Sequence, residues 1–248
     1  MACRRRDDDK FGSDESEECK MHLGDPAPDF TAWTSAKDDE PLHFHRWLGD
    51  SWCILFSHPA DFTPVCTTEL AALARLHPEF TALNCKVLGL STDSVETHRS
   101  WIQDINSLQA ENKTDVHFPI IADEDLSISK LYGMLDSPLH DPHNLNMRTG
   151  MPLTVRTVFI IDPKRTIRLM LTYPAAVGRD FGEILRCVKA LKLVTEEPVA
   201  TPADWRPGQE VIVRVEVTDE QAQQQFSHMR IVKPYLRFVD LSQPSKTA

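Results

Sequence analysis

The sequence predicts an α/β fold in which helices cover a largely parallel central sheet. Short, strongly apolar runs begin at residues 52, 86, 158 and 167, and they have the length and composition of buried strands. Between and after them lie stretches whose apolar residues recur at the spacing of an amphipathic helix. Strands that alternate with helices along a chain are typical of α/β proteins with a mostly parallel sheet.

The first strands and helices are expected between residues 52 and 108. The run 52–56 predicts a strand, and the run 86–90 predicts a second one. The helix between them has a single apolar stripe, formed by Leu73, Leu76, Phe80 and Leu83. Asp93 followed by Glu96 resembles a capped helix start for the segment that ends at Leu108.

The later elements follow the same pattern. The runs 158–161 and 167–171 predict two more strands. A second amphipathic helix is indicated by Phe181, Ile184, Val188 and Leu191. Beyond it, apolar and polar residues alternate in 211–215 and 235–238, which predicts two short strands.

Composition divides the chain into four parts. Residues 1–22 are polar and acid-rich, so we expect them to form a disordered extension. Residues 23–195 contain the alternating strands and helices and form the main domain. Residues 196–240 begin with three closely spaced prolines and are expected to form a small C-terminal module, too short to hold a core by itself. Residues 241–248 form a tail.

The charge balance excludes some classes of partner. Lys and Arg number 27 against 37 for Asp and Glu, a formal net charge of −10. Nucleic acids and anionic membranes attract basic surfaces, so neither is expected as a partner. No apolar run approaches the ~18 residues that span a bilayer, and the N-terminal residues lack the apolar region of a secretory signal. We therefore expect a cytoplasmic protein without an integral membrane segment.

The chain has six cysteines, at positions 3, 19, 53, 66, 85 and 187. They form no Cys-x-x-Cys pair and no zinc-type spacing with histidine, so no metal site is expected. His140 and His143 lie in the polar loop 138–151 and are expected to be solvated. In a reducing compartment, such cysteines stay free thiols unless one is catalytic.

Cys66 differs from the other cysteines in its local sequence. Thr63 is a good helix N-cap and Pro64 suits the first helical position, so Cys66 is expected in the first turn of a helix. Unpaired backbone N–H groups and the helix dipole favour an anion there, and the thiolate is the nucleophilic form of cysteine. The spacing alone leaves open whether Cys66 is a nucleophile or packs inward as a small apolar residue.

A motif around Cys66 and several further segments occur in collinear order over residues 23–240. The motif is Pro59-x-x-x-Thr63-x-x-Cys66. The further segments are Leu23-Gly24-Asp25-x-Ala27-Pro28-x-Phe30, Gly49-Asp50-Ser51-Trp52, Phe118-Pro119-Ile120-Ile121, Gly150-Met151-Pro152-x-Thr154-x-Arg156, Tyr173-Pro174-Ala175 and Ala200-Thr201-Pro202-x-Asp204-Trp205. Together they resemble the one-cysteine peroxiredoxins, the peroxiredoxin six subfamily of the AhpC/TSA family.

The resemblance implies a thioredoxin-like fold with a small C-terminal peroxiredoxin module. It also implies a thiol-dependent peroxidase of antioxidant defence and redox homeostasis, which reduces hydrogen peroxide and organic or lipid hydroperoxides. Cys66 would attack the peroxide and become a sulfenic acid. Thr63 would hydrogen-bond the peroxide, and Pro59 would shield the pocket from water. Arg156 would stabilise the thiolate and the leaving oxygen.

The same resemblance assigns supporting roles to three further residues. Glu69 and Arg179 would hold Arg156 and the first helix in place. His58 matches a histidine beside the pocket in this subfamily.

The sulfenic acid must be reduced again, and no cysteine follows Cys187 in the chain. Cys187, Cys85 and Cys53 lie beside or within apolar runs and are expected in the core. Cys3 and Cys19 lie on the acidic extension, where nothing in the sequence requires a catalytic part. The resemblance therefore implies no bound cofactor, an external reductant such as glutathione or another small thiol, a glutathione transferase as a candidate partner, and a homodimer.

Two alternative functions stay open at the level of sequence. A phospholipase or other acyl hydrolase would use Ser51, His45 and Asp162. The sequence departs from the hydrolase pattern at three points. Cys53 replaces the last glycine of Gly-x-Ser-x-Gly, and Ser51 opens a strand instead of a strand-to-helix turn. Asp162 lies two residues earlier than the aspartate of the related pattern. In a one-shot redox sensor or holdase, peroxide would oxidise Cys66 once and no catalytic cycle would follow.

Overall fold

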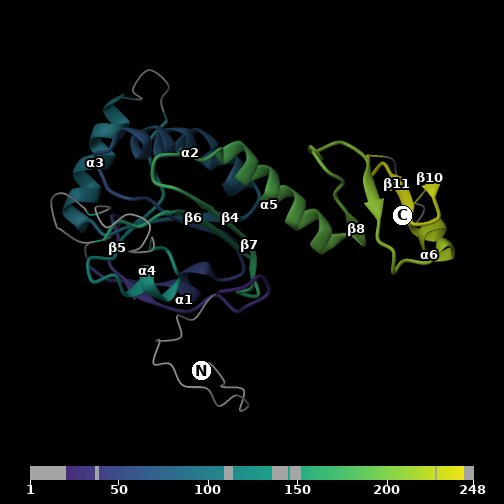
Figure 1. Cartoon of the computed structure of the whole chain (residues 1–248), viewed down its shortest axis with the longest axis horizontal. Helices are drawn as coiled ribbons and strands as arrows, with labels where there is room; N and C mark the ends of the chain where they lie inside the picture. Colours follow the sequence, from purple (N-terminus) through teal and green to yellow (C-terminus); the bar gives the residue numbers. More distant parts are fainter. Residues whose placement is uncertain are drawn as a thin grey trace, which may run out of the picture.

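A five-stranded sheet forms the centre of the main domain (Figure 1). The computed structural model describes residues 21–36, 39–108, 114–135, 145, 152–226 and 228–242. In spatial order the strands are β5 (Ile120–Ala122), β4 (Cys85–Ser91), β3 (Trp52–Ser57), β6 (Arg156–Ile161) and β7 (Ile167–Tyr173). The strands expected at 52, 86, 158 and 167 are all confirmed.

The direction of β6 corrects the prediction of a largely parallel sheet. β3 pairs with β4, and β4 with β5, in parallel, but β6 runs antiparallel to both β3 and β7. β6 and β7 form a hairpin closed by Asp162, whose Oδ1 accepts from the backbone N–H groups of Lys164 and Thr166 at 2.9 and 3.0 Å. Because so short a connection can join only antiparallel strands, the sheet is mixed.

Helices cover both faces of this sheet (Figure 1). The helices α2 (Pro64–Ala82), α3 (Val95–Leu108) and α5 (Phe181–Glu196) share one apolar core with alternate residues of β3, among them Ile54 and Phe56. The opposite face of β3 packs against α1 (Phe44–Leu48) and α4 (Ser127–Leu131). The helices expected from the stripes that begin at residues 73 and 181 are confirmed as α2 and α5.

The start of α3 differs from the expected cap. Ser94, not Asp93, caps the helix, because its Oγ accepts from the backbone N–H of Thr97 at 3.3 Å. The Asp93 carboxylate instead accepts from the backbone N–H of Asp61 at 2.8 Å. Asp93 thereby joins the end of β4 to the loop that precedes Cys66.

The C-terminal residues form a separate small sheet beyond the end of α5 (Figure 1). Its elements are β8 (Val199–Ala200), β9 (Val211–Val213), α6 (Asp219–Gln225), β10 (Met229–Lys233) and β11 (Leu236–Val239). The small core of this module includes Trp205, Phe226 and Ala190, and Ala190 belongs to α5. The module thus completes its core with the last turns of that helix.

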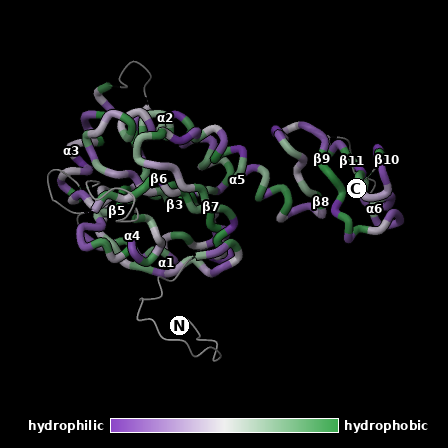
Figure 2. Tube along the Cα trace, in the orientation of Figure 1, coloured by the Kyte–Doolittle hydropathy of each residue, from purple (hydrophilic) through white to green (hydrophobic). Residues whose placement is uncertain are grey.

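Hydrophobic residues follow the central strands and α5 (Figure 2). Two short strands before β3, β1 (Thr31–Ala32) and β2 (Leu42–His43), pair with each other. Among the described helices, none combines the length and hydropathy needed to span a bilayer. The expectations for residues 1–20, for His140 and His143, and for residues 243–248 lie outside the described residues.

Candidate active site

Cys66 is the third residue of α2, as the sequence predicts. β3 ends at Ser57, a loop follows, and Thr63 is the N-cap with extended backbone angles, φ −108° and ψ 147°. The first hydrogen bond inside the helix runs from the N–H of Thr67 to the carbonyl oxygen of Thr63 at 3.0 Å. Earlier N–H groups have no acceptor within the helix, so the first turn presents positive partial charge around Cys66.

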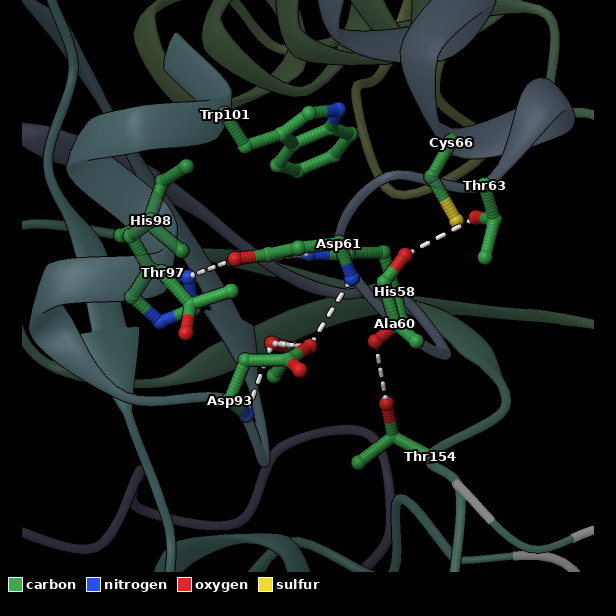
Figure 3. Close-up of polar contacts among 12 residues, drawn as sticks. His58, Ala60, Asp61, Thr63, Cys66, Asp93, Thr97, His98, Trp101 and Thr154 are labelled. Carbon is green, nitrogen blue, oxygen red and sulfur yellow. Dashed lines mark hydrogen bonds and ion pairs between the residues drawn. The ribbon is translucent and has the colours of Figure 1, made fainter. Parts of the chain in front are cut away.

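The side chain of Thr63 does not act as the cap. Its hydroxyl donates to the carbonyl oxygen of Ala60 at 2.8 Å, which closes the loop before α2 (Figure 3). Since the proton of this hydroxyl is used within the loop, the oxygen presents its lone pairs as acceptors. Thr63 is thus oriented to receive a hydrogen bond from a molecule that reaches Cys66.

The loop before α2 contains a strained residue. Phe62 has a φ of 55°, a left-handed conformation that is costly for a bulky side chain. Phe62 is 47% exposed, whereas Pro59 in the same loop is buried. Strain of this kind persists where the surrounding structure holds it, and it is common at functional sites.

Arg156 is the first residue of β6 and contacts the sulfur directly. Its Nη1 lies 3.3 Å from Sγ of Cys66 and 2.7 Å from Oε2 of Glu69. Its Nε donates to the carbonyl oxygen of Ala175 at 2.8 Å. These bonds fix the plane of the guanidinium, and the whole side chain is buried.

Glu69 lies one turn after Cys66 on α2 and pairs with a second arginine. Its carboxylate accepts from the backbone N–H, Nε and Nη2 of Arg179, at 2.7, 3.0 and 2.7 Å. Burial alone would raise the pKa of Glu69, but the hydrogen bonds and charge of Arg179, with the charge of Arg156, hold it below its usual value. Glu69 is therefore ionised beside two cations.

Arg179 ties this cluster to the central sheet. Its Nη1 donates to the carbonyl oxygens of Ser57 and Thr157, at 2.8 and 3.1 Å. Burial lowers the pKa of Arg179, although the contact with Glu69 opposes that shift. The structure thus brings together Cys66, Arg156, Glu69 and Arg179, which are far apart in the sequence.

His58 belongs to a second buried cluster, which the sequence did not predict (Figure 3). Its Nε2 lies 2.8 Å from Oδ1 of Asp61, and Oδ2 of Asp61 lies 2.6 Å from Nδ1 of His98 on α3. Burial alone would raise the pKa of Asp61, but hydrogen bonds from His58 and His98 lower it to about 2. Asp61 stands inside the Pro59–Cys66 motif, whereas His98 looks like any polar residue of an amphipathic helix.

The other described cysteines are buried and have no disulfide partner. Burial raises the pKa of Cys53, and it raises that of Cys85 to about 12. The pKa of Cys187 rises to about 11 because of burial and the nearby carboxylate of Glu183. These thiols stay protonated at neutral pH, which confirms the expectation that they belong to the core.

The structure does not join the three residues expected for a hydrolase. Ser51 donates to Oδ1 of Asn84 at 2.9 Å, and Nε2 of His45 lies 2.8 Å from the carbonyl oxygen of Ala27. Asp162 accepts from Nη1 of Arg168 at 3.0 Å and closes the β6–β7 turn. All three lie in the described part of the chain, and no hydrogen bond links any two of them.

No group of three or more His, Cys, Asp or Glu side chains that could hold a metal ion occurs among the described residues. The contacts near α2 place a thiol, that of Cys66, beside the guanidinium groups of Arg156 and Arg179.

Two family models match the chain. Residues 23–170 match the AhpC/TSA family, and residues 190–228 match the C-terminal domain of 1-Cys peroxiredoxin. The chain belongs to the AhpC/TSA family of peroxiredoxins. This peroxiredoxin is a thiol-dependent peroxidase, and its C-terminal module is that of the 1-Cys type.

Relatives agree with this assignment over nearly the whole chain. The peroxiredoxin is 46% identical to peroxiredoxin-6 of Rattus norvegicus, over 87% of this chain and 96% of the relative. It is similar to a crystal structure of peroxiredoxin 6 from Arenicola marina, with a TM-score of 0.80 and 41% identity, over 89% of this chain and 98% of that one. It also resembles a yeast mitochondrial 1-Cys peroxiredoxin, with a TM-score of 0.77 and 44% identity, over 89% and 99% of the two chains. The predicted thioredoxin-like fold is confirmed.

Proposed function

We propose that Cys66 is the peroxidatic cysteine of this peroxidase. The contact of 3.3 Å between its sulfur and Nη1 of Arg156 supports this role. The Cys66 thiolate attacks one oxygen of the hydroperoxide, so that an S–O bond forms and the O–O bond breaks. The sulfur becomes a sulfenic acid, and the other oxygen leaves as hydroxide or alkoxide and takes a proton from solvent.

Three further residues act on the peroxide in this proposal. Thr63 accepts a hydrogen bond from the peroxide hydroxyl, and Pro59 limits the access of water to the sulfur. Arg156 stabilises the thiolate before attack and the negative oxygen as it leaves, because a fixed guanidinium is a preorganised donor. Glu69 and Arg179 hold Arg156 in that geometry through the bonds described above.

The substrates in this proposal are hydrogen peroxide and organic or lipid hydroperoxides. Phe62, which is 47% exposed in the loop that ends at Thr63, provides an apolar surface for the carbon chain of an organic hydroperoxide. This range of substrates is tested by measuring how fast hydrogen peroxide and a fatty-acid hydroperoxide each oxidise Cys66. Replacement of Phe62 by Ser is expected to slow the second reaction more than the first.

The reductant we propose is an external small thiol, with glutathione as the candidate. A solved relative, the yeast mitochondrial 1-Cys peroxiredoxin, is described as resolving its thiol through glutathione and thioredoxin systems. Here a glutathione thiolate would attack the sulfenic sulfur, forming a mixed disulfide and releasing water after the hydroxyl takes a proton. A second glutathione would then restore the Cys66 thiol and leave as glutathione disulfide. A glutathione transferase would be the partner that delivers the thiol.

Turnover is the test of this function. Peroxide consumption in the presence of excess glutathione should continue for many equivalents per Cys66. A redox sensor that oxidises once would consume a single equivalent and stop, and that outcome would contradict the proposal. Mass spectrometry after one equivalent of peroxide should find the added oxygen on the peptide that contains Cys66.

We also propose a homodimer. β7 is an edge strand of the central sheet and carries the half-buried apolar residues Leu169, Met170 and Leu171. An edge strand offers unpaired backbone groups to a second copy. Analytical ultracentrifugation should give twice the mass of the chain, and a monomer mass at micromolar concentration would contradict this.

A cytoplasmic location is proposed from the sequence, although the yeast relative is mitochondrial. Cell fractionation with an antibody against the native protein tests it, and co-purification with mitochondria would contradict it.

A further inference from the structure

A tight turn of the backbone is centred on Arg156. The N–H of Thr157 donates to the carbonyl oxygen of Val155 at 3.1 Å, so the hydrogen bond joins residues two apart in the chain. A three-residue turn closed in this way is a γ-turn, which is common at the ends of strands. The turn lies where β6 begins, and its central residue carries the side chain that contacts Cys66. The conformation of the turn therefore determines where the Arg156 guanidinium starts.

The hydroxyl group of Ser57 binds both ends of this turn. Ser57 is the last residue of β3, and it is fully buried. Its Oγ donates to the carbonyl oxygen of Val155 at 2.5 Å and accepts from the N–H of Thr157 at 3.2 Å. The donor and the acceptor that close the γ-turn are thus both bonded to one hydroxyl group.

This contact lies where the regular pairing of β3 with β6 stops. The last paired residues are Phe56 and Val158, and Ser57 and Thr157 come next in that register. Here the Ser57 side chain joins the two strands. Nη1 of Arg179 also bridges the carbonyl oxygens of Ser57 and Thr157, at 2.8 and 3.1 Å. The end of β3 and the start of β6 are therefore fixed to each other through side chains.

The Arg156 side chain is held at both of its ends. The guanidinium is bonded to Glu69 and to the carbonyl oxygen of Ala175, as described above. The backbone from which it extends is held by Ser57. A functional group must stay within about 0.5 Å and 10–20° of its productive geometry. A single hydrogen bond adds little net stability, so the γ-turn alone is a weak support for a group that must be placed this accurately.

We propose that Ser57 is a positioning residue for the reaction at Cys66. Its hydroxyl group keeps the turn at 155–157 closed, and the closed turn keeps Nη1 of Arg156 at 3.3 Å from the sulfur. Ser57 acts through Arg156 and takes no part in the chemical step itself. This inference rests on the roles proposed above for Cys66 and Arg156.

Ser57→Ala tests this role without leaving the backbone of the turn unpaired. The N–H of Thr157 keeps its bond to the carbonyl oxygen of Val155, so we expect the variant to fold. Competition with a second peroxidase measures how fast hydrogen peroxide oxidises Cys66. This rate should fall by about 10- to 100-fold, because displacing a group by about 1 Å at a reacting centre can cost 100-fold.

Ser129→Ala is the matched control. Ser129 is also a fully buried serine, and its Oγ donates to Oδ2 of Asp123 at the same distance of 2.5 Å. It lies on α4, which packs against the opposite face of β3 from α2. Its removal should leave the rate of Cys66 oxidation at the wild-type value.

A double variant separates positioning from general stability. If Ser57 acts through Arg156, then Ser57→Ala combined with Arg156→Met should react at the rate of Arg156→Met alone, because the group that Ser57 positions is absent. A merely structural role predicts that the two reductions in rate multiply. Circular dichroism checks that each variant is folded.

The side-chain signal of Arg156 gives a second measurement, by ¹⁵N nuclear magnetic resonance. Its Nε–H donates to the carbonyl oxygen of Ala175 and is identified by its absence in Arg156→Met. This signal should move in Ser57→Ala and stay unchanged in Ser129→Ala. An unmoved signal in folded Ser57→Ala would contradict the proposed role.

A wild-type rate in folded Ser57→Ala, or reductions that multiply in the double variant, would overturn the inference. If Ser57→Ala does not fold, Ser57→Cys replaces it, because a thiol donates and accepts hydrogen bonds only weakly. Ser57→Cys should slow the reaction in the same way, and a wild-type rate there would also overturn the inference. Failure of the peroxidase proposal would appear separately, as peroxide reduction that survives Cys66→Ser or as a wild-type rate in Arg156→Met.

Discussion

Nη1 of Arg156 lies 3.3 Å from Sγ of Cys66 and 2.7 Å from Oε2 of Glu69, so one guanidinium group spans the sulfur and the carboxylate. Arg179 binds the same carboxylate. Two buried cations therefore face one carboxylate, and the cluster is neutral only when Cys66 is a thiolate. In the proposed mechanism, the net positive charge of the two guanidinium groups and one carboxylate lies beside the sulfur that attacks the peroxide.

Replacement of Arg156 by Met should slow the oxidation of Cys66 by peroxide. Loss of one preorganised donor at a reacting centre costs about 10²–10³ in rate. Competition with a second peroxidase of known rate measures the change. Arg168→Met, which removes an arginine that pairs with Asp162 in the β6–β7 hairpin, is the control and should keep the wild-type rate. An equal rate in Arg156→Met would reject the role proposed for Arg156.

Cys66→Ser should abolish peroxide reduction, because a serine hydroxyl is not ionised at neutral pH. Cys53→Ser, Cys85→Ser and Cys187→Ser should keep most of the activity when folded, since burial keeps these thiols protonated. Peroxide consumption with excess thiol compares the four proteins, with circular dichroism as the check on folding. Full activity in Cys66→Ser would refute the assignment of the nucleophile.

The pKa of Asp61 predicts a specific loss of stability in acid. This pKa falls from 3.8 to about 2 on folding, so the carboxylate stabilises the fold above about pH 4 and loses this effect as the pH falls towards 2. The shift corresponds to about 2 kcal/mol. Urea unfolding at pH 5, 4, 3 and 2 measures the free energy of unfolding of the wild type and of Asp61→Asn. Between pH 5 and pH 2, this free energy should fall by about 2 kcal/mol more in the wild type than in Asp61→Asn. Parallel losses in the two proteins would contradict the prediction.

The local part of the site could be predicted from sequence because neighbouring residues determine it. Thr63 and Pro64 set the start of α2, and Cys66 follows in the first turn. Arg156 is 90 residues away from Cys66, and only its family motif indicated that the two meet. Local patterns hold no information on which distant side chain reaches a helix terminus.

Other features depend on tertiary contacts and could not be predicted in this way. Asp61 and His98 are separated by 37 residues, and their contact requires α3 to pack against the loop after β3. The antiparallel pairing of β6 with β7 follows from the short turn at Asp162, but that turn does not set the direction of β6 relative to β3. The apolar content of these runs predicts strands but does not give their direction.

The last prediction concerns how the oxidised Cys66 is resolved, because the other cysteines in the described part of the chain are all buried. After one equivalent of peroxide, Cys66 should persist as a sulfenic acid and then form a mixed disulfide with added glutathione. Cys53, Cys85 and Cys187 are buried with raised pKa values, so none of them offers a thiolate that could attack the sulfenic sulfur. The same reasoning predicts ready over-oxidation to the sulfinic acid when peroxide is in excess and thiol is withheld.

Non-reducing gels and peptide mapping after one turnover measure the outcome. The expected product is a single adduct of glutathione on the Cys66 peptide, without a disulfide between two protein cysteines. Cys19→Ser and Cys187→Ser are the controls, and neither should change the yield of this adduct. A stoichiometric bridge from Cys66 to Cys19 or to Cys187 would refute the one-cysteine mechanism, because it would give the N-terminal extension or α5 a direct part in resolving the sulfenic acid.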